Sequence, residues 1–124
     1  MLWGACDALA TPRPLCPLID IAETTQGDLL ASLREGEKPH AVFVALVEEL
    51  RAVRPTIAVI EDVHWADEAT LDVIRLLARR AETLGALVVV TYRENELAPT
   101  DPVRLAVGEL GTAPGVTQLR LPPL

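Results

Sequence analysis

The chain has 124 residues, of which 50% are hydrophobic and 23% are charged, and its formal net charge is −7. This much apolar surface is typical of a single folded domain and excludes disorder as the main state. The apolar runs are far shorter than the roughly 20 residues that cross a bilayer. Residues 1–4 show no export signal, so we expect a cytoplasmic protein with no membrane partner. Because the acidic balance repels a phosphate backbone, we expect no direct contact with nucleic acid.

Apolar runs and helical spacings alternate along the chain and predict an α/β protein. In chain order the patterns predict a short strand at 2–5, a helix from about residue 18, a helix at 40–54, a strand at 56–60, a helix at 67–84, a strand at 86–92, a helix from residue 101 and an edge strand at 116–121. The strands at 56–60 and 86–92 do not alternate apolar with polar residues, which is typical of parallel strands covered on both faces. Asp67 is predicted to be the N-cap of its helix.

Charged side chains follow both of these strands. Glu61 and Asp62 come directly after the first, and Arg93 follows the second. A carboxylate pair after a buried strand is the Walker B arrangement, in which one acid holds the water shell of Mg²⁺ and the other orients the attacking water. An arginine on the next strand can donate two hydrogen bonds to a terminal phosphate. The alternatives are acids that only solvate a strand end and a surface arginine paired with Glu94 or Glu96.

The residues around these positions resemble a known family, the STAND-type AAA+ P-loop ATPases, and most closely the ATPase modules of large LuxR-type transcriptional regulators. Residues 61–71 resemble the extended Walker B segment and residues 89–94 the sensor strand. Residues 2–7, the loop at 11–15 and residues 119–124 are similar to the second strand, the loop after it, and the last core strand with the start of the lid. The resemblance implies a three-layer P-loop NTPase sandwich, with Glu61 at the magnesium position, Asp62 as the catalytic acid and Arg93 facing the γ-phosphate of ATP. The order of roles within the acid pair stays open.

The glycine-rich phosphate loop that ends in Gly-Lys-Ser/Thr does not occur in the sequence. Lys38 is the only lysine, and the proline that follows it offers neither a hydroxyl for Mg²⁺ nor an N–H. In the family this loop precedes the segment that begins the chain. We therefore expect residues 1–124 to be a partial ATPase domain that lacks the P-loop strand and the lid. ATP and Mg²⁺ are expected cofactors of the parent protein, whose other domains are the expected partners. Whether the parent forms oligomers stays open.

For the chain by itself we expect no cofactor, negligible ATP binding and low stability. In the family's sheet the P-loop strand lies between the sensor strand and the last core strand, so its loss exposes an edge of the strand at 86–92 and leaves 116–121 without a neighbour. A non-catalytic interaction or regulatory α/β module is the alternative function. A phosphoacceptor receiver domain is excluded, because Arg93 stands where the phosphorylated aspartate belongs and no lysine follows Lys38.

The remaining polar and aromatic residues are expected to have structural roles. Cys6 and Cys16 are expected to be reduced, buried and inert, and their spacing is not that of a zinc site. His64 lies far along the chain from His40 and is not expected to bind a metal. Trp65 is expected to pack between the strand end and the next helix.

Overall fold

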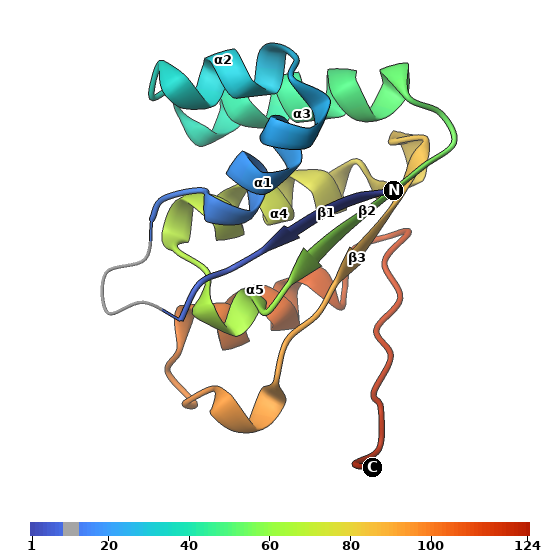
Figure 1. Ribbon diagram of the computed structural model, residues 1–124. Helices are drawn as coiled ribbons and strands as arrows, with labels where there is room; N and C mark the ends of the chain where they lie inside the picture. The colour runs from blue at the N-terminus through green and yellow to red at the C-terminus, as the bar shows by residue number, and fades with distance from the viewer. Residues whose placement is uncertain (9–12) are drawn as a thin grey trace.

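The structure is a computed structural model that describes residues 1–8 and 13–124 (Figure 1). These residues form a three-stranded parallel sheet of β1 (Leu2–Ala5), β2 (Thr56–Glu61) and β3 (Ala86–Val90), in the order β1-β2-β3. Leu2 lies opposite Ala58 in the register. The predicted parallel α/β fold is confirmed, as are the strands expected near 2–5, 56–60 and 86–92. Residues 11 and 12 of the loop that resembled the family lie outside the described residues.

The helices predicted near residue 18, at 40–54, at 67–84 and from residue 101 are present with shifted ends, and a further helix at 28–34 was not predicted. The described residues form the α-helices α1 (Cys16–Thr25), α2 (Asp28–Arg34), α3 (Pro39–Ala52), α4 (Glu68–Arg79) and α5 (Pro102–Leu110), and the 3-10 turns η1 (Val63–Trp65), η2 (Ala81–Thr83) and η3 (Glu94–Glu96). The helix expected at 67–84 ends at Arg79, because the backbone leaves the helical region at Arg80 (φ −108°). Gly85 then turns the chain into β3 with φ +72°, which favours glycine. None of the helices in the described ranges is long and apolar enough to cross a membrane.

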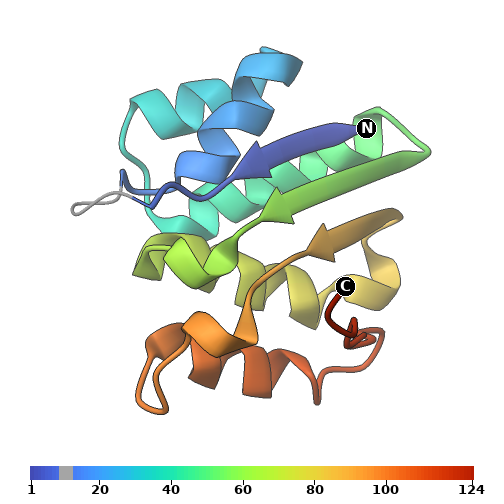
Figure 2. The same ribbon diagram turned by 60° about the horizontal axis from the view of Figure 1, so that its bottom comes forward.

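The helices cover one face of the sheet. Figure 2 shows the sheet toward the viewer with α3 and α4 behind it. Side chains on the covered face are buried, among them Leu2, Ala58 and Ile60, which join the core. The α1 helix packs so closely on this face that a Cβ on Gly4 would lie 2.0 Å from the carbonyl oxygen of Pro17. Glycine is therefore the residue that lets β1 and α1 approach.

The opposite face of the sheet is apolar and largely open to solvent. Its exposed side chains alternate with the buried ones and are Trp3 (47% exposed), Ile57 (42%), Leu87 (58%) and Val89 (37%). We call this set the open face. Val59 also points to this side but is only 7% exposed, since Trp3 and Val89 flank it in the register. The prediction that both faces of these strands are covered is wrong, because the helices described here pack on the other side.

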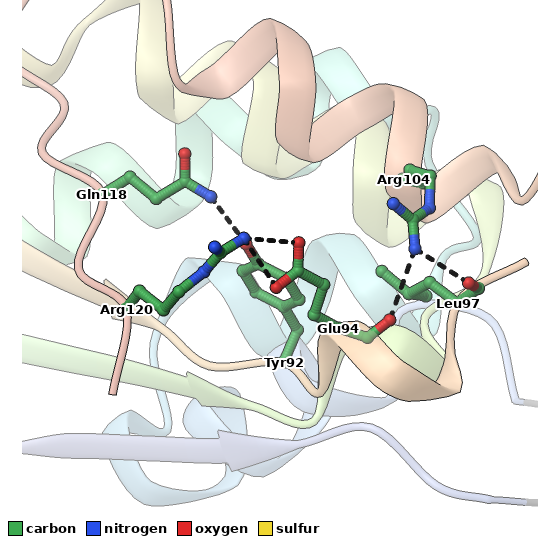
Figure 3. Close-up of polar contacts among 6 residues, drawn as sticks. All are labelled: Tyr92, Glu94, Leu97, Arg104, Gln118 and Arg120. Carbon is green, nitrogen blue, oxygen red and sulfur yellow. Dashed lines mark hydrogen bonds and ion pairs between the residues drawn. The ribbon is translucent and has the colours of Figure 1, made fainter. Parts of the chain in front are cut away.

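The prediction of an edge strand at 116–121 is also wrong. The chain after α5 is irregular, and Leu119 and Leu121 are 81% and 84% exposed. Two side chains of this tail bond to the segment after β3: Gln118 Nε2 donates to the Tyr92 hydroxyl at 2.6 Å, and Arg120 Nη2 donates to the Glu94 carboxylate at 2.8 Å (Figure 3). An alternating pattern yields a strand only where a neighbouring strand completes the backbone hydrogen bonds, and among the described residues β3 pairs only with β2.

Candidate functional site

Backbone hydrogen bonds join the carboxyl ends of the three strands. The amide of Cys6 donates to the carbonyl of Glu61 at 2.9 Å, which ties β1 to β2. On the other side, the amide of Thr91 donates to the carbonyl of Ile60 at 3.0 Å, and the amide of Val63 donates to the carbonyl of Thr91 at 2.9 Å. The segments that carry Glu61-Asp62 and Arg93 therefore meet at one edge of the sheet. This is the edge where ligands of open α/β sheets bind.

The acid pair lies on a sharp turn at this edge. Asp62 has φ 57° and ψ 42°, a left-handed conformation that aspartate tolerates better than most residues, and the turn leads directly into η1. The Thr91 hydroxyl accepts the amide hydrogen of Asp62 at 3.2 Å, which ties this turn to the sensor segment. Glu61 accepts a hydrogen bond from Trp3 Nε1 at 2.9 Å. Since Trp3 belongs to the open face, the Glu61 carboxylate lies on the side of the sheet that the helices leave free.

Arg93 is anchored by its backbone and exposed at its tip. Its amide donates to Nδ1 of His64 at 3.2 Å. Its side chain is 69% exposed and pairs with Glu96 Oε1 at 3.3 Å. Among the described residues no hydrogen bond or ion pair joins the guanidinium to Glu61 or Asp62. The structure therefore brings the two segments together through their backbones, and it shows the arginine in the surface pairing that was the alternative interpretation.

His64 has a role that the sequence did not reveal. Its side chain is 2% exposed, and its two ring nitrogens face the Arg93 amide and Glu96 Oε2, the latter at 3.3 Å. The ring of Trp65 lies 5.1 Å from it, centroid to centroid, at 50°. Trp65 itself is 42% exposed, so it packs only on one side. The usable signal was a histidine two residues after the acid pair, between Val63 and Trp65, where a buried ring needs partners.

Asp67 caps α4, as predicted, and also holds a second segment. Its Oδ2 accepts the amide hydrogen of Thr70 at 3.3 Å. Its Oδ1 accepts the amide hydrogen of Leu15 at 3.2 Å. Leu15 has φ 58° and precedes α1. One carboxylate thus fixes the start of α4 and the start of α1 beside the candidate site.

The two cysteines are free and buried, in agreement with their expected structural role. Burial, with a contribution from the Asp67 carboxylate, raises the pKa of the Cys6 thiol to about 12. Burial also raises the pKa of Cys16, whose Sγ donates to Asp7 Oδ2 at 3.2 Å. Thiols that hold their protons are poor nucleophiles, so neither is a candidate for covalent chemistry. In the described ranges no three His, Cys, Asp or Glu side chains are grouped to hold a metal ion.

A cavity of about 190 Å³ lies between α5 and the segment after β3, and Figure 3 draws several of the residues that line it. Its walls include Tyr92, Leu97 and Val107. Arg104 also lines it and donates to the carbonyl oxygens of Leu97 and Glu94, at 3.0 and 3.4 Å. None of the residues predicted for the phosphate site lines this cavity.

A family model described as an AAA ATPase domain matches residues 2–90 of the chain. The chain belongs to this family. The matched range includes all three strands and the Glu61-Asp62 pair and ends before Arg93. No curated protein and no solved structure matches the chain. The resemblance read from the sequence is thus confirmed at the level of an AAA+ P-loop ATPase module.

The residues of this AAA ATPase domain fit the magnesium-binding part of a magnesium–nucleotide site but not its phosphate-binding part. Glu61 and Asp62 supply the carboxylate oxygens that Mg²⁺ prefers, and they follow a buried strand at the open edge of the sheet. The groups that grip the phosphates, a glycine-rich loop with its lysine and hydroxyl, do not occur in the sequence. The chemistry of Glu61 and Asp62 thus fits the carboxylate part of a Mg²⁺ site, and the sequence does not contain the motif that holds a triphosphate.

Proposed function

We propose that the chain is the Walker B and sensor part of a STAND-type AAA+ ATPase, from a cytoplasmic parent protein of the LuxR regulator type. In that parent the bound nucleotide acts as a conformational switch that the other domains of the protein read. The observation that carries the proposal is the position of Glu61-Asp62. The pair lies at the end of β2 in an AAA ATPase domain, and its turn is tied to Thr91, two residues before Arg93.

Each polar residue at the edge has a role in this proposal. Glu61 holds the water shell of Mg²⁺, and Asp62 orients the water that attacks the γ-phosphate; the two roles can be exchanged within the pair. Mg²⁺, when bound, neutralises the charge on the phosphate oxygens. Arg93 donates to the γ-phosphate, for which its guanidinium is accessible, since 69% of the side chain is exposed.

The chain by itself is proposed not to bind or hydrolyse ATP. Two observations support this: the sequence has no Gly-Lys-Ser/Thr, and the outer edge of β3 has no strand beside it in the described residues. In the parent, the P-loop strand would pair with that edge and its helix would cover the open face. The unpaired edge of β3 and the open face are then both explained by the P-loop strand and its helix in the parent.

The test compares the 124-residue chain with the product of the complete reading frame. The gene upstream of Met1 is sequenced, and Mg-ATP binding of both proteins is measured by isothermal titration. We expect a Gly-Lys-Ser/Thr motif upstream, micromolar binding by the long protein and none by the chain. Micromolar binding by the chain would overturn its proposed inactivity, and an upstream sequence without the motif would overturn the proposed parent.

The roles of the acids are tested in the long protein. Asp62→Asn and Glu61→Gln are each expected to lower the rate of ATP hydrolysis by about 10²–10⁴-fold. Glu68→Gln is the matched control, because Glu68 is an exposed acid in the first turn of α4 and is expected to leave the rate unchanged. If the acid-pair variants hydrolyse ATP as fast as this control, the Walker B assignment is wrong.

A second candidate, a non-catalytic interaction module, is favoured by one observation. The open face presents four exposed apolar side chains on a regular sheet, which is a typical surface for a protein partner. The same experiment separates the candidates. An interaction module begins at Met1 as its true start and has no nucleotide-binding parent.

A further inference from the structure

The buried ring of His64 connects two parts of one arginine. Its Nδ1 faces the Arg93 amide at 3.2 Å, and its Nε2 faces Glu96 Oε2 at 3.3 Å. The other carboxylate oxygen of Glu96 receives Nη1 of Arg93, also at 3.3 Å. The backbone and the guanidinium of Arg93 are thus both attached to the same imidazole, one directly and one through Glu96.

These contacts define the protonation of the ring. The Arg93 amide is a donor, so Nδ1 must be the acceptor, and Nε2, which faces the Glu96 carboxylate, carries the N–H of the ring. Burial makes the ring a rigid anchor, since only 2% of its side chain is exposed, against 31% for Glu96 and 69% for Arg93. Exposure to solvent therefore increases from the buried His64 ring through Glu96 to the guanidinium of Arg93.

We propose that His64 is a positioning residue for Arg93. It sets the backbone of Arg93 through Nδ1 and holds the guanidinium on Glu96 until a phosphate draws it away. His64 also lies two residues after Asp62, in η1, so the same short turn carries the catalytic acid and the anchor of the arginine. A shift of the Asp62 turn is then passed to Arg93 through one ring. This inference rests on the proposed function, which places Arg93 at the γ-phosphate.

The first test measures the hydrogen bond in the 124-residue chain by ¹⁵N NMR. We expect the Nδ1 resonance of His64 to be that of an unprotonated nitrogen that accepts a hydrogen bond. In His64→Ala, the Arg93 amide should exchange with solvent about 2- to 12-fold faster, the factor for one lost hydrogen bond. The amide of Thr91, which donates to Ile60, is the internal reference and should not change. His64→Asn should restore slow exchange, because its amide oxygen can take the place of Nδ1.

Two results of this test would overturn the role of His64. One is a ring proton on Nδ1, which cannot accept from the Arg93 amide. The other is unchanged exchange at Arg93 in His64→Ala. If that variant does not fold, Glu96→Gln replaces it. This partly exposed site should leave the fold and the backbone bond intact while the Arg93 side chain becomes more mobile. Unchanged mobility in Glu96→Gln would overturn the link through Glu96.

A second test separates this inference from the proposed function. Inorganic phosphate is titrated into the chain, and the Nε resonance of Arg93 is followed. We expect phosphate to bind about 1.5- to 5-fold more tightly to Glu96→Gln than to the wild type, because an exposed carboxylate no longer competes for the guanidinium. Glu68→Gln is the control for the loss of one negative charge. If phosphate affects Arg93 equally, or not at all, in both proteins, the holding of Arg93 by Glu96 is refuted, whereas the proposed function stands or fails on the ATP binding and hydrolysis of the long protein.

Discussion

Replacing Leu87 by alanine tests whether the open face is exposed to solvent in the chain by itself. Burying a whole leucine side chain contributes about 1.5–3 kcal/mol. Leu87 is 58% exposed, so only the buried remainder of its side chain stabilises the fold. Leu87→Ala is therefore expected to lower the free energy of unfolding by about 0.6–1.3 kcal/mol. Leu77, on α4, is the matched control because it is 4% exposed, and Leu77→Ala is expected to cost about 3–5 kcal/mol.

The free energy of unfolding of both variants is measured by urea titration, followed by tryptophan fluorescence. Trp3 is a suitable reporter because it lies on the open face. If Leu87→Ala is as costly as Leu77→Ala, something covers the open face and the reasoning fails. Repeating the titration at several protein concentrations then identifies a second copy as the cover, since only association makes the midpoint depend on concentration.

Three further predictions concern single contacts. Gly4→Ala should lower stability by about 1–3 kcal/mol, because its Cβ would lie 2.0 Å from a backbone oxygen of α1. Gly108→Ala is the control and should raise stability by up to about 1 kcal/mol, since nothing lies within 4 Å of a Cβ at that helical position. Thermal unfolding compares the two variants. Asp67→Ala should cost about 0.5–2 kcal/mol in urea unfolding through the lost N-cap. Cys6 should resist alkylation in the folded chain, since burial raises its pKa to about 12. The unfolded thiol ionises near 9.0 while the folded thiol keeps its proton, so stability should fall as the pH rises above that value, which urea titrations at increasing pH measure.

Local patterns predicted the elements whose partners lie within the chain. The apolar runs of β2 and β3, the N-cap at Asp67 and the Asp101-Pro102 start of α5 are all present, because capping and β-branched runs act over a few residues. The edge strand at 116–121 failed for the opposite reason. Its alternating pattern is typical of a strand, but a strand also needs a neighbour, and none of the described strands pairs with it.

The candidate site was predictable in its residues but not in its connections. The sequence placed Glu61, Asp62 and Arg93 at strand ends, and parallel pairing brings those ends together. It gave no sign that Asp62 adopts a left-handed conformation, because aspartate occurs in every kind of turn. It also did not show the partners of His64, since a buried polar ring is satisfied by whichever groups the tertiary fold brings near it.

The contacts at the sheet edge bear on why the chain should fail to bind ATP. Four hydrogen bonds that involve Thr91 and His64 connect residues 60–64 to residues 91–93, and none of them needs a nucleotide. The turn that carries Glu61 and Asp62 is therefore formed in the chain by itself. If the proposed function is correct, supplying the groups that grip phosphate should restore binding without rearranging the turn at Asp62. Amide resonances of Asp62 and Val63 that stay unchanged between the chain and the long protein would agree with this, and large shifts would show that the P-loop also shapes the acid pair.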